Sequence, residues 1–309
     1  MSTPLAPGVW GVLATPFAGS ALEVDETSLA RAVDLYTAAG ATGLTVLGVF
    51  GEAAHLDLAE QHDVVEVVGE TRGDLPMVVG LAGRSTRVAI EQARTVLDAA
   101  GGADGVAGLM VLVNTADPAV LARHLRAVHA ETGAGIVVQD YPLISGVRID
   151  QRVLARVVAE NADIVVAVKS ESPPTAPAIA TLTAVTDLPV FGGLGGVGLL
   201  DELAAGSAGA MTGFSYPEAL VATVEAWRSG GFEAAREVFA PWLPLVNFEA
   251  QPGIGLAVRK ECIRRRGTFI ESGVRPPAPS LPESLAPMAA AHIAAAERLL
   301  GEPTDGVNA

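Results

Sequence analysis

Cysteine, lysine and aromatic residues are all scarce in this chain of 309 residues. The single cysteine, Cys262, excludes an internal disulfide framework and is typical of a reducing compartment. Two of the 20 basic residues, Lys169 and Lys260, are lysines. Aromatic residues make up 5% of a chain that is 50% hydrophobic. The core must therefore consist mainly of Ala, Val and Leu, which favours helices packed closely on a sheet.

Long apolar runs and an excess of basic residues are also lacking. No uninterrupted apolar run reaches the roughly 20 residues of a membrane-spanning helix. Residues 1–17 have neither the charged region nor the long apolar core of a signal peptide. The net charge of −15 argues against binding to nucleic acid or to an anionic membrane. We therefore expect a cytoplasmic globular protein that binds neither.

Short apolar runs alternate with Ala-rich segments of helical periodicity. The runs are residues 11–17, 43–48, 76–83, 105–113, 135–142, 163–169, 188–193 and 209–214. Continuous apolar strands separated by helices predict parallel βαβ units, because the strands of such units are buried on both faces. The eight runs within about residues 9–230 match the number of strands that closes a TIM-type barrel. We predict a single (β/α)8 barrel over residues 1–230, with a C-terminal helical extension, residues 231–309, packed on it.

Lys169 stands at the end of the sixth predicted strand, in "DIVVAVKSES". Active sites of such barrels lie at the carboxyl ends of the strands. Burial there disfavours the ammonium form, and the resulting neutral amine can attack a carbonyl carbon. Taken alone, the position is also compatible with a lysine that caps the strand and extends its amine into solvent.

Two further motifs accompany this lysine. "GVFGEAAHL" (48–56) follows the second predicted strand, and "VVQDYPLISGV" (137–147) ends the fifth. Together with Lys169, they resemble the dihydrodipicolinate synthase / N-acetylneuraminate lyase superfamily of class I aldolases and lyases, over about residues 8–300. The resemblance implies that Lys169 forms an imine with the keto group of pyruvate or another 2-oxo acid. Such an imine permits carbon–carbon bond cleavage or formation, or loss of a β-leaving group.

The turn after the second strand departs from the family pattern. Gly48, Gly51 and Glu52 keep it, but Val49 and Phe50 replace two threonines. The resemblance implies that this turn holds the substrate carboxylate, and here only the backbone amides remain to do so. We expect Phe50 to add an apolar wall to the site and Glu52 to serve a structural role.

The motif after the fifth strand departs further. Gln139 stands where the family has its catalytic tyrosine, Asp140 replaces an asparagine, and Ile144 replaces an arginine that the synthase uses for its second substrate. Tyr141 lies two residues on, so it shares a face of an extended strand with Gln139. Either Tyr141 supplies the phenol, or a water held by Gln139 moves the proton, or Tyr141 is an aromatic residue of the barrel rim. These departures argue against dihydrodipicolinate synthase proper.

The loop "GGLGGVG" (192–198) contains the spacing of a dinucleotide fingerprint. It follows the seventh strand of eight, where barrels place phosphate or carboxylate groups on backbone amides. We therefore favour contact between the substrate carboxylate and Gly192 and Gly193 over a dinucleotide. The histidines form no ligand set and no C-x-x-C or H-E-x-x-H motif occurs, so we expect neither a metal nor an organic cofactor.

The leading hypothesis is a Schiff-base lyase or aldolase that acts on a 2-oxo acid. The candidate residues are Lys169, Tyr141 and Gln139 for catalysis, and Gly48, Val49, Phe50, Asp140, Gly192 and Gly193 for substrate binding. Ser170 and Glu171 are either residues that tune Lys169 or solvated loop residues. The alternatives are a 2-oxo acid dehydratase using the same imine, a barrel that binds a small carboxylate or phosphate without turning it over, and a NAD-dependent oxidoreductase. The resemblance also suggests a homo-oligomer, a tetramer built from dimers.

Overall fold

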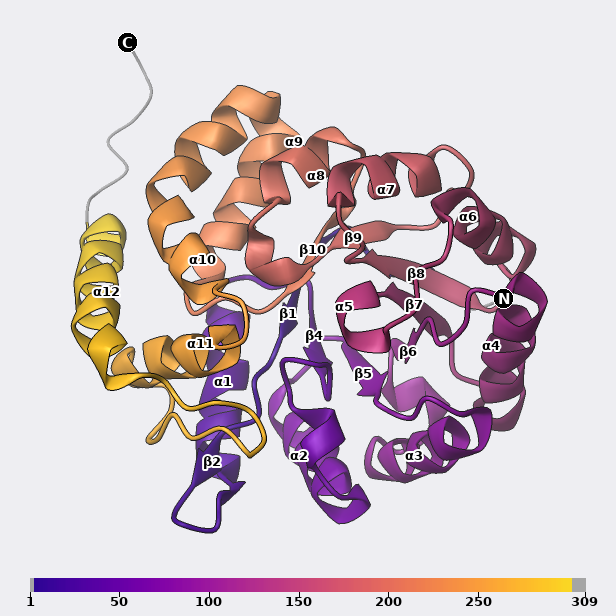
Figure 1. Ribbon diagram of the computed structural model, residues 1–309, viewed down its shortest axis with the longest axis horizontal. Coiled ribbons are helices and arrows are strands. Elements are labelled where there is room, and N and C mark those ends of the chain that lie inside the picture. The colour runs from indigo at the N-terminus through magenta and orange to yellow at the C-terminus, as the bar shows by residue number, and fades with distance from the viewer. Residues whose placement is uncertain (1–2, 302–309) are drawn as a thin grey trace.

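The computed structural model describes residues 3–301 as a closed barrel of eight parallel strands surrounded by helices (Figure 1). The strands are β1 (Gly8–Val12), β4 (Gly43–Val46), β5 (Met77–Leu81), β6 (Gly108–Leu112), β7 (Ile136–Asp140), β8 (Val165–Ser170), β9 (Val190–Gly192) and β10 (Gly209–Thr212). Each pairs with the next, and β1 closes the ring by pairing with both β4 and β10. The predicted (β/α)8 barrel is confirmed.

Helices connect successive strands and cover the outside of the barrel (Figure 1). They are α1 (Glu26–Ala38), α2 (Leu58–Thr71), α3 (Thr86–Ala99), α4 (Pro118–Thr132), α6 (Gln151–Glu160), α7 (Thr175–Thr183), α8 (Leu199–Ala204) and α9 (Pro217–Phe239). Aspartates cap several of them: Asp57 and Glu60 form a reciprocal capping box at α2, and Asp117 accepts two amide hydrogens before Pro118 at α4. Polar residues placed just before apolar periodic segments thus set where the helices begin.

Shorter elements lie at the two ends of the barrel. They are the hairpin β2 (Phe17–Ala18) and β3 (Glu23–Val24), the helix α5 (Pro142–Ser145), and the 3₁₀ turns η1 (Ala53–His55), η2 (Ala103–Gly105) and η3 (Leu194–Gly196). In Figure 1, α5 lies in front of the barrel strands, so it stands over the carboxyl end of β7. This end carries the candidate site.

The core has two layers, because the strands bury side chains on both faces. Outward-facing residues pack on the helices in a large apolar cluster, which includes Leu44, Val79 and Val168. A smaller cluster, which includes Trp10 and Phe191, fills the barrel interior. The interior is therefore a packed core, and room for a ligand has to be found at the strand ends.

The chain after the last strand forms further helices at one side of the barrel (Figure 1): η4 (Ala240–Trp242), α10 (Leu243–Glu249), α11 (Gly255–Arg265), η5 (Glu283–Leu285) and α12 (Ala286–Gly301). They pack on α8, α9 and β10 through a second apolar cluster. The expected boundary after residue 230 falls inside α9, beside Gly231, whose φ of 72° interrupts the helix. Residues 302–309 of the expected extension lie outside the described residues, and the division into two parts stays a prediction. None of the described helices is long and apolar enough to cross a membrane.

Candidate active site

Lys169 is buried at the carboxyl end of β8, between β7 and β9. Its side chain is only 5% exposed, and the strand register places Lys169 beside Gln139 on one side and Phe191 on the other. Lys169 is therefore not a strand-capping lysine whose amine extends into solvent. An amine in this position is available only to a molecule that enters the mouth of the barrel.

Glu171 connects Lys169 to the neighbouring strand ends. One carboxylate oxygen, Oε2, lies 3.5 Å from Lys169 Nζ and accepts a hydrogen bond of 2.7 Å from Gln139 Nε2. The other, Oε1, accepts the Leu194 amide hydrogen at 3.2 Å. Glu171 itself is 4% exposed, so it is not a solvated loop residue. The alternation of side chains along a strand could have indicated this, since residues i and i+2 share a face.

Asp140 and Tyr141 take different directions from the end of β7. The Asp140 carboxylate is buried and accepts a hydrogen bond of 2.7 Å from Gln151 of α6, on the outside of the barrel. Burial raises the pKa of Asp140, and the negative charge of Glu171 raises it further. Tyr141 starts α5 and is half-buried; burial, followed by the charge of Glu171, raises its pKa to about 12. The Tyr141 phenol therefore stays protonated at neutral pH.

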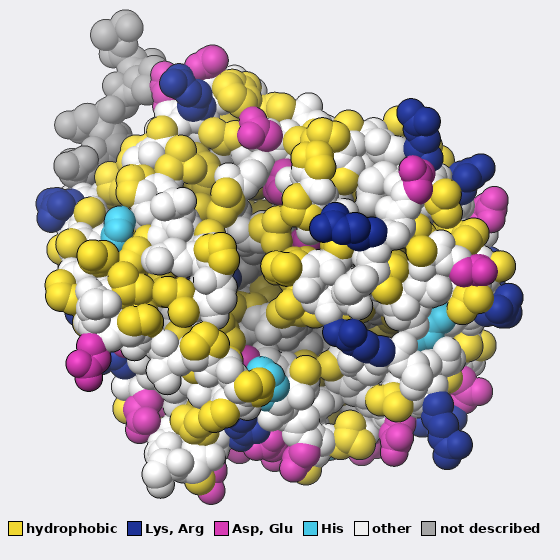
Figure 2. Space-filling model, in the orientation of Figure 1, with side chains coloured by type: hydrophobic (Ala, Val, Ile, Leu, Met, Phe, Trp, Pro, Cys, Tyr) yellow, Lys and Arg dark blue, Asp and Glu magenta, His cyan; other side chains and the backbone are white. Residues whose placement is uncertain are grey.

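A cavity of about 230 Å³ opens at the mouth, over the ends of β4 to β7. Figure 2 shows this face of the molecule hollowed near its centre. Three of the expected site residues line it, namely Gly48, Val49 and Gln139. The other expected residues, Lys169, Tyr141, Phe50, Asp140, Gly192 and Gly193, do not. Gln139 thus stands between the cavity and the Lys169–Glu171 pair.

The turn after β4 places Glu52 among the residues that line this cavity, whereas Phe50 is not one of them. The Glu52 carboxylate forms a buried ion pair with Lys260 and accepts the Arg275 amide hydrogen at 3.1 Å, as expected for a structural residue. The Phe50 ring packs against Gly213 and lies under the Arg259 guanidinium, 4.5 Å from the ring centroid. Phe50 thus does not line this cavity, and its expected role as an apolar wall of the site stays a prediction.

Lys260, the second lysine of the chain, has no access to the cavity. It is fully buried, donates to the Gly273 carbonyl at 2.8 Å and lies over the Phe17 ring, 4.2 Å from its centroid. Burial lowers its pKa to about 8, although the Glu52 carboxylate opposes that shift. Lys260 is thus a buried structural cation.

The glycines after β9 make room for two buried carboxyl groups. A Cβ atom at Gly192 would overlap Glu202 of α8, and one at Gly193 would overlap Glu171. Neither carboxyl oxygen of Glu202 has a hydrogen-bond partner among the described residues, although the Thr175 hydroxyl lies nearby. Burial raises the pKa of Glu202 to about 7, and the charge of Glu171 adds to this shift. The loop borders acidic groups on this side, which does not suit the pyrophosphate of a dinucleotide.

Glu202 and two residues of the cavity rim, His55 and Arg84, did not emerge from the sequence. Glu202 lies within a short amphipathic helix, where a glutamate is ordinarily exposed. Arg84 follows the third barrel strand, in a loop without a motif of its own. Their positions depend on contacts between segments distant in the chain, so no local signal marks them.

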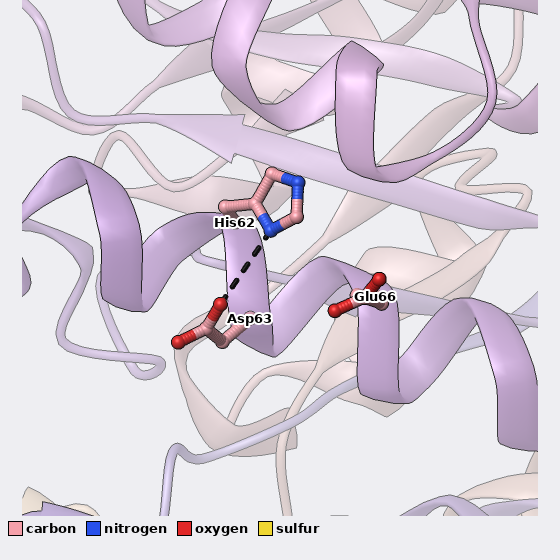
Figure 3. A group of neighbouring side chains, drawn as sticks. All are labelled: His62, Asp63 and Glu66. Carbon is pink, nitrogen blue, oxygen red and sulfur yellow. Dashed lines mark ion pairs between the residues drawn. The ribbon is translucent and has the colours of Figure 1, made fainter.

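A group of potential metal ligands lies elsewhere, on α2. His62, Asp63 and Glu66 bring one ligand atom each to within 4.8 Å of the others (Figure 3). His62 is half-buried, both acids are exposed, and His62 Nδ1 lies 3.5 Å from Asp63 Oδ1. All three residues belong to α2, a helix on the outside of the barrel (Figure 1), whereas Lys169 belongs to β8. The group is an ordinary polar helix surface, and the expected absence of a catalytic metal stays a prediction.

Comparison with known proteins identifies the family and agrees with the fold. The family model for the dihydrodipicolinate synthetase family matches residues 6–296. L-2-keto-3-deoxyarabonate dehydratase of Azospirillum brasilense is 30% identical over 288 residues, which cover 91% of both chains. 4-Hydroxy-tetrahydrodipicolinate synthase of Methanopyrus kandleri is 28% identical over 251 residues, 77% of this chain and 79% of that one. The crystal structure of dihydrodipicolinate synthase from Rhodopseudomonas palustris superposes with a TM-score of 0.86 at 30% identity, covering 95% of this chain and 98% of the other.

Proposed function

This chain belongs to the dihydrodipicolinate synthetase family of class I lyases and aldolases, and from that premise we propose that it eliminates water from a 2-oxo acid through an imine on Lys169. The observation that carries the proposal is the buried Lys169–Glu171 pair, with 3.5 Å between Nζ and Oε2. It joins a nucleophilic amine and a potential base at one place.

The chemistry follows from the position of these groups. The Lys169 amine adds to the keto carbon and water leaves, so that a protonated imine forms. The imine withdraws electrons from C3, and Glu171 takes a C3 proton to give an enamine. The enamine then expels a hydroxyl group from C4, which leaves as water after gaining a proton. Hydrolysis of the imine consumes one water molecule, releases an unsaturated 2-oxo acid and restores Lys169.

Gln139 and Tyr141 support these steps in different ways. Gln139 cannot titrate, and its amide holds Glu171 by a hydrogen bond of 2.7 Å. The protonated Tyr141 phenol is a proton donor that the leaving hydroxyl group can use. The amides of Gly48 and Val49, at the cavity wall, are the proposed site for the substrate carboxylate. The relative of A. brasilense, named as a dehydratase, is consistent with this assignment.

The base is tested by exchange of the methyl protons of pyruvate for solvent deuterium, followed by NMR. Glu171→Gln should slow exchange by about 100-fold or more, because the general base is lost, while pyruvate can still be trapped on Lys169 by cyanoborohydride. Glu160→Gln, an exposed residue of α6, is the matched control and should exchange at the wild-type rate. Exchange at an unchanged rate in Glu171→Gln would remove the carboxylate from the mechanism.

Aldol cleavage is the second candidate reaction. In this reaction the Glu171 carboxylate accepts the proton of a C4 hydroxyl group while the C3–C4 bond breaks, and the electrons of that bond pass to the imine to form an enamine. Pyruvate and an aldehyde would then be the products, whereas dehydration gives an unsaturated 2-oxo acid and no aldehyde. Product analysis by NMR with 2-oxo acids that carry a C4 hydroxyl group separates the two reactions.

We also propose that the protein works in the cytoplasm as a homo-oligomer, a dimer or tetramer, on a small 2-oxo acid such as pyruvate or a longer homologue. The single cysteine supports a reducing compartment. Exposed apolar side chains at the barrel mouth and on the extension, such as Leu143 and Ile270, support association. Light scattering on the purified chain measures the assembly directly, and a monomer would contradict this part of the proposal.

A further inference from the structure

The cavity at the barrel mouth has a basic end that the imine chemistry does not use. Of the residues that line it, His55 and Arg84 carry basic side chains, Glu52 carries a carboxylate that is paired with Lys260, and Gln139 is the strand neighbour of Lys169. Most of the remaining wall is apolar and includes Leu81, Met110 and Leu112. The cavity therefore combines two basic side chains and a largely apolar wall with a residue that donates a hydrogen bond to Glu171.

Arg84 is held over the cavity from two neighbouring loops. Asn114, after β6, donates to the Arg84 carbonyl at 2.8 Å. The Arg84 guanidinium donates to the Ile144 carbonyl at 2.6 Å and to the Ser145 carbonyl at 3.3 Å, both in α5. A guanidinium carries five N–H donors, so donors remain free after these two bonds. Its fork is thus fixed in place and still able to bind a ligand.

His55 reaches the same cavity from the other side, in the turn η1 after β4. Its carbonyl accepts a hydrogen bond of 3.0 Å from Arg275, which fixes the backbone. Its Nδ1 atom is buried, without a hydrogen-bond partner among the described residues, and lies 3.6 Å from Glu52 Oε2. The imidazole can therefore still form a hydrogen bond, and leaving a buried polar atom without one costs free energy.

The negative charge around the site explains why basic side chains at the cavity would favour the binding of an anionic substrate. Asp140, Glu171 and Glu202 are buried at the other side, in a chain whose net charge is −15. An anionic substrate entering such a site needs cationic groups on its path. Figure 2 shows Lys or Arg side chains beside the central hollow.

We infer that Arg84 and His55 form a subsite for the far end of the substrate. The ligand class is a 2-oxo acid with an oxygen-bearing far end, either hydroxyl or carboxylate, separated from the keto group by one or two unsubstituted carbons that suit the apolar wall. The inference rests on the proposed function, because it takes the Lys169 end as the reacting end. Arg84 and His55 are thus residues that select among 2-oxo acids and do not take part in imine formation.

The test compares how tightly different acids are held before they are trapped on Lys169. The probes are pyruvate, which has no far end, 2-oxobutanoate, with an apolar end, 2-oxoglutarate, with a carboxylate, and L-2-keto-3-deoxyarabonate, with hydroxyl groups. The half-saturating concentration for cyanoborohydride trapping is measured by mass spectrometry of the Lys169 peptide. Arg84→Met and His55→Gln are the variants, and Arg87→Met, an exposed arginine at the start of α3, is the control of equal charge.

We expect either variant to raise the half-saturating concentration for acids with an oxygen-bearing end by about ten-fold or more, as the loss of a charge-assisted hydrogen bond implies. Pyruvate and 2-oxobutanoate should change by less than about two-fold, and the Arg87 variant should match the wild type. A loss confined to 2-oxoglutarate assigns the subsite to a carboxylate, and one confined to the sugar acid assigns it to hydroxyl groups.

Two results would overturn the inference while leaving the proposed function intact. One is trapping of all four acids with unchanged preference in both variants. The other is an equal loss for every acid, pyruvate included, which would give the residues a structural role. Because His55→Gln leaves the bonds from Arg84 to α5 in place, it remains informative if Arg84→Met disturbs that helix. If the wild-type protein traps none of the acids, the proposed function fails and the subsite with it.

Discussion

Glu202→Gln should change how the stability of the protein depends on pH. Glu202 is 1% exposed, its carboxyl oxygens have no hydrogen-bond partner among the described residues, and the neighbouring Glu171 disfavours a second negative charge. The folded protein therefore prefers the protonated form of Glu202, with a pKa raised from 4.5 to about 7. The unfolded chain has no such preference, so the two states bind the proton with different strength.

The magnitude follows from that difference. A group whose pKa is higher in the folded state holds its proton there while the unfolded chain has already lost it, so the free energy of unfolding falls as pH rises. The fall begins near the unfolded pKa of about 4.5 and is complete above the folded pKa of about 7. At about 1.4 kcal/mol per pKa unit, the full fall amounts to about 3.5 kcal/mol, an order-of-magnitude figure.

Urea unfolding at pH 5 and pH 8 measures this contribution when the wild type and Glu202→Gln are compared. Asp140 and Glu249 also have raised pKa values, so they too lower the stability of the wild type as pH rises. Glu202→Gln should lose about 2.5 kcal/mol less than the wild type between the two pH values, whereas Glu225→Gln, an exposed residue of α9, should not differ from it. Parallel loss in the wild type and Glu202→Gln would refute the assignment of Glu202 as a buried neutral acid.

Three further changes test other contacts of the site. Gly193→Ala should slow pyruvate deuterium exchange by about ten-fold or more, because a Cβ atom there displaces Glu171 and removes part of the general-base contribution. Gly69→Ala, in open space on α2, is the control and should have no effect on the exchange rate. Lys260→Met should lower the free energy of unfolding by about 3–5 kcal/mol in urea titrations, because it leaves Glu52 buried and unpaired. Glu52→Gln combined with Lys260→Met should recover most of that loss, and a double variant as unstable as the single one would contradict the pairing.

The barrel and its reactive end could be predicted from the sequence because both depend on local patterns. Apolar runs buried on both faces, separated by capped helices, indicate parallel strands, and a lysine that ends one of them must lie at the mouth. The barrel and the position of Lys169 require only the chain order and the side-chain period of a strand. Gln139 became a candidate through the resemblance of residues 137–147 to the family motif, and the strand register of the fold sets it beside Lys169.

The remaining features depend on contacts between distant segments. The sequence does not indicate that the Phe50 ring lies under Arg259, a residue more than 200 positions away in the chain. Glycines 192 and 193 suggested a cradle for an anion, whereas in the fold a carboxyl group lies against each of them. Arg84 has no sequence signal, because a hydrogen bond to α5, about 60 residues further along the chain, holds it at the cavity. Sequence patterns indicate which end of the barrel is used, and tertiary packing decides which side chains face the ligand.

The central claim is that Lys169 forms the imine, and trapping tests it most directly. The protein is incubated with pyruvate and with longer 2-oxo acids, reduced with borohydride, digested and analysed by mass spectrometry, with Lys169→Arg as the variant that cannot form an imine. The account predicts a mass increase of the reduced adduct on the Lys169 peptide of the wild type, and no adduct in the variant. A folded wild-type protein with an unmodified Lys169 for every acid, or with the adduct on Lys260, would contradict it.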